Sequence, residues 1–78
     1  MEVVYTNHSL SRMEKYGVTK EEVEDCLFSP DSTVESYSRR IVYQKVSGNY
    51  VLRVVVEERK EIKRVVTVYR SRRQRYGI

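Results

Sequence analysis

The second half of the chain most constrains the fold, because it holds four runs of β-branched and aromatic residues joined by short connections. Such runs favour strands, and they lie near residues 33–37, 40–46, 50–57 and 62–69. A parallel pair of strands needs a crossover of roughly a dozen or more residues, and none of these connections is that long. The sequence therefore predicts an antiparallel meander, with a hairpin turn at Ser47-Gly48-Asn49 and a second, charged turn at residues 58–61.

A short strand and a first helix are predicted before this meander. Residues 2–5 are apolar enough for the strand, and either Thr6 or Asn7 can cap the helix that follows. The helix is expected from about His8 to Tyr16. Gly17 is its predicted end, because glycine readily adopts the left-handed conformation that terminates helices.

The second helix has the clearest local signal. Thr19 and Glu22 have the spacing of a capping box, in which each side chain bonds the backbone of the other residue. Pro30 cannot continue a helix and predicts its end. The expected buried stripe consists of Val23, Cys26 and Leu27. Cys26 is therefore interpreted as a small core residue rather than a nucleophile.

Alternation along the strands assigns side chains to the two faces of the sheet. The aliphatic sets are expected to pack under the helices: Leu52, Val54, Val56, Ile62, Val66 and Val68. The opposite face is expected to present the intervening side chains: Val51, Arg53, Val55, Val65, Thr67 and Tyr69. Whether Tyr43 or Gln44 joins this second set depends on the turn length, which the sequence leaves open.

The positive charge is confined to one end of the chain. The protein has 15 basic and 11 acidic side chains, and its last nine residues hold four arginines and no acid: Arg70, Arg72, Arg73 and Arg75. Guanidinium groups bind phosphates and stack on bases, so these arginines and Tyr76 are candidate RNA-binding residues. A frayed tail that only aids solubility is the open alternative.

Several classes of protein are disfavoured. One cysteine allows no intrachain disulfide, and no apolar run reaches the roughly 18 residues of a membrane helix. The first six residues are too short and polar for a signal peptide, which favours a cytoplasmic location. One histidine and scattered acids offer no metal-ligand spacing, so no metal is expected. A domain of 78 residues cannot hold a deep cofactor cleft in addition to its core, so no other cofactor is expected.

The remaining chemistry suits metal-free RNA cleavage, in which the ribose 2′-hydroxyl attacks the adjacent phosphate. This reaction needs a base, cations for the charge that develops on phosphorus, and an acid for the leaving oxygen. His8 is the candidate base, Arg12 and Arg53 are the candidate cations, and Tyr69 or Tyr76 is the candidate acid or stacking platform. The competing interpretation is that the arginines form ion pairs with surface acids and that His8 is an ordinary surface residue.

Residues 8–13 read His-Ser-Leu-Ser-Arg-Met, and residues 17–23 read Gly-Val-Thr-Lys-Glu-Glu-Val. This order resembles the small proteins of domain-of-unknown-function family 4258, which read H-x-x-x-R-M, then G-I/V, then S/T-x-E-E-V. Further pieces fit in the same order over nearly the whole chain: Pro30-Asp31 and residues 40–45, 52–56 and 66–69.

That family is similar to the RelE/ParE-like toxins, and the resemblance implies their fold and activity. The expected fold is a single α+β domain over residues 1–78, with a basic tail at 70–78. Two N-terminal helices would pack on one face of a four- or five-stranded, mostly antiparallel sheet. The implied activity is a metal-independent ribonuclease toxin, with RNA, free or on the ribosome, and an antitoxin as partners. The positions that would carry catalysis are His8, Arg12, Arg53, Thr67 and Tyr69.

Two alternatives remain beside this expectation. One is a non-catalytic module that binds RNA or protein through the same sheet face and tail. The other is a toxin that docks on another protein without contacting RNA. Fold resemblance alone does not choose among them.

Overall fold

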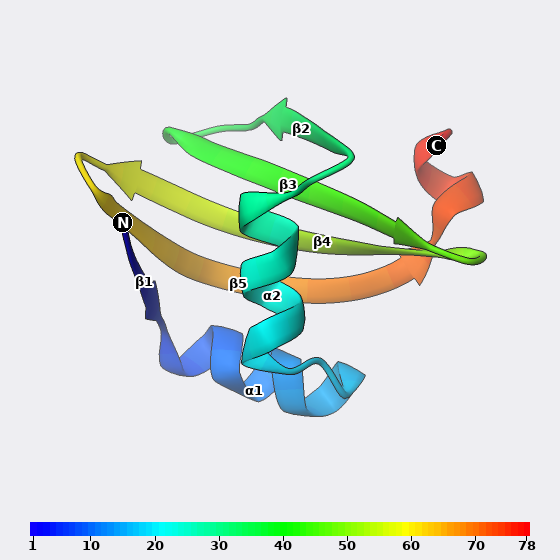
Figure 1. The fold of residues 1–78 in the computed structure, drawn as a ribbon, viewed down its shortest axis with the longest axis horizontal. Helices are drawn as coiled ribbons and strands as arrows, with labels where there is room; N and C mark the ends of the chain where they lie inside the picture. The colour runs from blue at the N-terminus through cyan, green and yellow to red at the C-terminus, as the bar shows by residue number, and fades with distance from the viewer.

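A computed structural model describes residues 1–78 as an α+β fold of two helices and a five-stranded sheet. Figure 1 shows the elements in chain order: β1 (Glu2–Tyr5), α1 (Asn7–Tyr16), α2 (Lys20–Phe28), β2 (Ser32–Glu35), β3 (Arg40–Ser47), β4 (Tyr50–Arg59), β5 (Ile62–Arg72) and the 3₁₀ turn η1 (Arg73–Tyr76). The predicted order of elements is confirmed. The last strand continues three residues into the expected tail, and the chain then turns.

The sheet is mixed, with the strand order β1-β5-β4-β3-β2. The strands β2 to β5 pair antiparallel, as predicted for the meander. The strand β1 instead pairs parallel with β5, from Glu2 opposite Ile62 to Tyr5 opposite Val65. The sheet is thus five-stranded and mostly antiparallel, as expected, with β1 as its parallel edge. The chain between β1 and β5 includes both helices and the meander, which is long enough to permit either direction.

Side chains cap both helices at their N-termini. The Thr6 hydroxyl accepts a hydrogen bond from the Ser9 backbone N–H at 3.0 Å, so Thr6 rather than Asn7 is the cap of α1. Gly17 ends that helix at φ 65°, in the left-handed region. The predicted capping box of α2 is confirmed, because Thr19 and Glu22 each bond the backbone N–H of the other.

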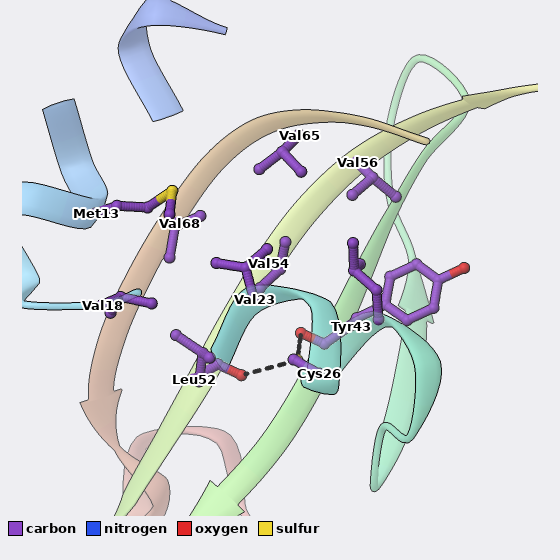
Figure 2. Close-up of a cluster of buried hydrophobic side chains, with 11 residues drawn as sticks. Met13, Val18, Val23, Cys26, Tyr43, Leu52, Val54, Val56, Val65 and Val68 are labelled. Atoms are coloured by element: carbon purple, nitrogen blue, oxygen red, sulfur yellow. Dashed lines mark hydrogen bonds between the residues drawn. The ribbon is translucent and has the colours of Figure 1, made fainter. Parts of the chain in front are cut away.

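Both helices pack on the same face of the sheet. In Figure 1, α2 lies across the sheet and α1 runs along the outer side of β5. Eleven buried side chains form the core between the layers, most of them shown in Figure 2: Met13, Val18, Val23, Cys26, Leu27, Tyr43, Leu52, Val54, Val56, Val65 and Val68.

Cys26 is a core residue, as its position on the α2 stripe predicted. Its thiol has no exposed surface and donates toward the carbonyl oxygen of Tyr43 at 3.5 Å (Figure 2). Burial raises the pKa of this thiol to about 12. Nucleophilic cysteines need the opposite shift, so Cys26 has a packing role.

A β-bulge in β5 changes the expected assignment of faces. Val54 pairs with Val68 and Val55 with Thr67, but Val56 then pairs with Val65, which leaves Val66 as an extra residue. Because the side-chain period of a strand is two residues, the extra residue moves everything before it to the other face. The assignment before the bulge was wrong, since Val65 is fully buried in the core. Ile62, assigned to the core, is 42% exposed.

The same register places Tyr43 under the helices, where it joins a polar network at the end of the core. The Lys63 ammonium donates to the Tyr43 hydroxyl and to Glu58, and the Tyr43 hydroxyl donates to Glu58. Burial alone would lower the pKa of Lys63, but these partners raise it above its usual value. Gln44 lies on the opposite face, buried, and donates to the Ser32 hydroxyl.

Candidate functional site

A shallow groove runs between α1 and the part of β5 beyond β1. The strand β1 ends opposite Val65, so after this point the edge of β5 borders a helix rather than another strand. The Thr6 hydroxyl donates to the Val66 carbonyl at 3.2 Å and fixes the start of α1 against β5. The groove has a volume of about 250 Å³, and six residues line it: His8, Arg12, Tyr16, Thr67, Val68 and Tyr69.

The helix wall of the groove is a regular stripe. His8, Arg12 and Tyr16 follow one another at intervals of four residues, which places them on one face of α1. The exposure decreases along the stripe, from the exposed His8 to the half-buried Arg12 and Tyr16. A histidine, a guanidinium and a phenol therefore point into the groove in a fixed order along the helix.

A stacked arrangement of three side chains adjoins the groove at Tyr69. Arg53 on β4 lies directly opposite Tyr69 on β5, and its guanidinium carbon is 5.5 Å from the centre of the Tyr69 ring. The Tyr76 ring, placed by η1, lies closer to the same guanidinium, at 3.9 Å. The Arg53 Nε is buried without a hydrogen-bond partner. Leaving such a donor unpaired is unfavourable. Because the atom is buried and Tyr76 lies over the guanidinium, an acceptor from outside would reach it only if Tyr76 moved.

The pKa values of the two tyrosines in this stack are shifted in opposite directions. Burial raises the pKa of Tyr69, and the neighbouring Tyr76 adds to the rise. Partial burial alone would also raise the pKa of Tyr76, but the Arg53 guanidinium and the Tyr69 hydroxyl lower it.

All five residues predicted to carry catalysis lie in one region. His8, Arg12, Thr67 and Tyr69 line the groove, and Arg53 joins it through its contact with Tyr69. Neither Arg12 nor Arg53 is among the four ion pairs of the chain, which involve Lys45, Lys63, Arg64 and Arg70. The His8 imidazole has no hydrogen-bond partner within the chain.

Tyr16 is a groove residue that the sequence interpretation did not include. The signal for it was present, because Tyr16 continues the spacing of His8 and Arg12 by one more turn of helix. Its position before Gly17 instead suggested no more than the end of the helix.

The tail arginines do not form the single cluster that the sequence suggested. Arg70 pairs with Glu22 at 2.9 Å on the helix-covered side of the sheet, and Arg72 lies 5.8 Å from the centre of the Tyr50 ring. Arg73 donates to the carbonyls of Gly48 and Ile78 and holds η1 against the β3–β4 turn. Arg75 is exposed and forms no ion pair.

A second hollow, of about 380 Å³, lies on the helix-covered side, between α2 and the ends of β3, β4 and β5. Its charged side chains already pair with one another, Arg70 with Glu22 and Lys45 with Asp25. No three His, Cys, Asp or Glu side chains gather to hold a metal ion. Neither helix is long and apolar enough to cross a membrane.

Comparison with known proteins yields one match. The family described as a domain of unknown function, DUF4258, matches residues 5–70, which include the groove and Arg53 but not Tyr76. No curated protein and no solved structure matches the chain.

Proposed function

The chain belongs to the DUF4258 family, and we propose that it is a metal-independent endoribonuclease of the RelE-like toxin class. The observation that carries the proposal is the groove between α1 and β5. An imidazole, a guanidinium and a phenol line this one groove, and Arg53 adjoins it through its contact with Tyr69. These are the three kinds of group that cleavage of RNA by its own 2′-hydroxyl requires.

The reaction assigns one role to each group. His8 takes the proton of the 2′-hydroxyl as the oxygen attacks phosphorus. Arg12 and Arg53 stabilise the negative charge that accumulates on the phosphoryl oxygens. The bond from phosphorus to the 5′-oxygen then breaks, and a tyrosine protonates the leaving oxygen. Tyr69 is assigned to this last step because it lines the groove, and a tyrosine hydroxyl is protonated at neutral pH. Its raised pKa makes it a weaker acid, so its position rather than its acidity supports this role.

One observation favours a second candidate, a non-catalytic module that binds RNA or protein. No side chain of this domain orients the His8 imidazole, whereas catalytic histidines are commonly held by a second group. An antitoxin, if one is made beside this protein, would inhibit either activity by covering the groove.

The two candidate functions differ in whether the protein cleaves RNA or only binds it. We expect the purified protein to cleave single-stranded RNA in EDTA and to leave 2′,3′-cyclic phosphate ends, detected by mass spectrometry of the fragments. The reaction is to be run with free RNA and with ribosomes carrying mRNA. Intact RNA in both reactions, together with measurable RNA binding, would select the binding module instead.

A separate prediction concerns the contribution of the C-terminal arginines to RNA affinity. Arg75→Ala is expected to reduce the dependence of log affinity on log salt concentration by about 0.7, the value for one lost phosphate contact on a single strand. Arg70→Ala is the matched control and should leave this slope unchanged, because Arg70 pairs with Glu22 on the other side of the sheet. Fluorescence anisotropy at several salt concentrations measures both slopes. Equal slopes for all three proteins would show that Arg75 makes no phosphate contact with the RNA.

A further inference from the structure

Tyr16 has a position in the groove that the proposed chemistry does not use. A helix rises about 1.5 Å per residue, so Tyr16 lies about 6 Å along α1 from Arg12 and about 12 Å from His8. A phosphate held between His8 and Arg12 is therefore centred nearer the start of the helix than Tyr16 is. A contact at Tyr16 therefore involves a different part of the ligand from the reacting group.

The ring of Tyr16 is fixed by the core on one side and lies under the ammonium of Lys15. It is half-buried and packs against the hydrophobic core, yet it lines the groove. Its hydroxyl has no hydrogen-bond partner within the chain. The ammonium of the exposed Lys15 lies 5.5 Å from the ring centre. A fixed aromatic ring next to an exposed cation can bind a base and its adjoining phosphate, once the base takes the place of the ammonium over the ring.

From this geometry we propose that Tyr16 is a base-stacking subsite for an unpaired nucleotide next to the scissile phosphate. The inference rests on the proposed function in one respect, since it takes RNA as the ligand of the groove. Both faces of a base inside a duplex are covered by its neighbours, so stacking on Tyr16 selects single-stranded RNA. The subsite does not depend on catalysis.

The structure offers variants that separate stacking from packing. Tyr16→Phe retains the ring and loses only the hydroxyl. Tyr16→Leu and Tyr16→Met retain apolar volume against the core but have no aromatic face. Thermal unfolding of each variant identifies those that are folded, and two ringless variants keep the comparison available if one of them unfolds.

The experiment is an abasic scan of a short single-stranded RNA with 2′-O-methyl groups, which remove the attacking hydroxyl and prevent cleavage. Each nucleotide in turn is replaced by an abasic unit, and the affinity is measured by anisotropy. For the unaltered protein and for Tyr16→Phe, we expect the abasic unit at one position to weaken binding by about 5- to 150-fold, the range for one base–aromatic stack. For the ringless variants, the same abasic unit should have no further effect.

The outcomes distinguish the subsite from the proposed function. A position-specific loss that vanishes in the ringless variants supports the subsite, even if the cleavage assay detects no product. Affinities of the unaltered protein that are insensitive to every abasic unit would overturn it, as would ringless variants that keep the full sensitivity. Equal affinity for duplex and single-stranded RNA would also overturn it, and in each of these cases the ribonuclease proposal can still hold.

Discussion

His8→Ala and Arg12→Ala are each expected to lower the rate of RNA cleavage in EDTA by about a hundredfold, the lower end of the effect of a lost general base or charge-stabilising group. Neither side chain is in the core, and substitutions on the surface usually change stability by less than about 0.5 kcal/mol. The expected loss of cleavage rate therefore reports on the chemical step rather than on folding. Single-turnover cleavage of a labelled RNA measures the rates.

A matched control lies on the same helix. Ser11 is exposed on α1 and does not line the groove, so Ser11→Ala should cleave at the unaltered rate. Arg12→Lys keeps the charge but not the planar, multidentate donors, and is expected to recover only part of the lost rate. Growth inhibition that persists in both His8→Ala and Arg12→Ala would contradict the ribonuclease and favour a toxin that docks on another protein.

Deleting Val55 from β4 is expected to destabilise the protein far more than deleting Val66 from β5. Deleting Val66 removes the extra residue of the bulge, so Val65 and Val68 remain on the core face and the ladder between β4 and β5 can close regularly. Deleting Val55, which has a partner in the ladder, reverses one arm of β4. Either Val56 or the pair Leu52 and Val54 then leaves the core.

The expected sizes of these effects differ widely. Each fully buried valine contributes about 1.5–3 kcal/mol, and a domain of 78 residues has a total stability of roughly 4–12 kcal/mol. The protein lacking Val55 should therefore lose about 1.5–6 kcal/mol, a large part of that stability. It should either lose its cooperative unfolding transition or show one at a much lower urea concentration. The protein lacking Val66 should retain one, shifted to lower urea concentration by the lost local contacts. Urea titrations followed by circular dichroism test both, and two equally unfolded proteins would contradict the assignment of Val66 as the extra residue.

Only part of the candidate site could be predicted from the sequence. The spacing of His8 and Arg12 is a property of one helix and needs no tertiary information. Thr67 and Tyr69 follow the bulge, where the alternation used for the prediction still holds, and so they share a face with Arg53. Ile62 and Val65 lie before the bulge and were assigned to the wrong faces. A bulge arises from how two strands twist against each other, and no residue type in β5 marks it.

The position of the C-terminal residues could be determined only from the complete fold. Composition indicated a basic tail, but the chain instead turns at Arg73, where its backbone N–H donates to the Asn49 carbonyl at 3.0 Å. This contact is available only because β5 ends beside the β3–β4 turn. It places Tyr76 on Arg53 rather than in solvent. Arg70 and Arg75 consequently lie on different surfaces, although they are close in the sequence.

The sequence by itself determined the features that depend on neighbouring residues. These are the capping box at Thr19, the end of α2 near Pro30, the meander and the buried stripe of α2, because caps, turns and periodicity act over a few positions along the chain. Only the tertiary structure decided the parallel edge strand β1, the register of β5 and the stacking of Tyr76 on Arg53. Each of these depends on contacts between segments distant in sequence, whose free energy is set by packing and backbone pairing rather than by local preference.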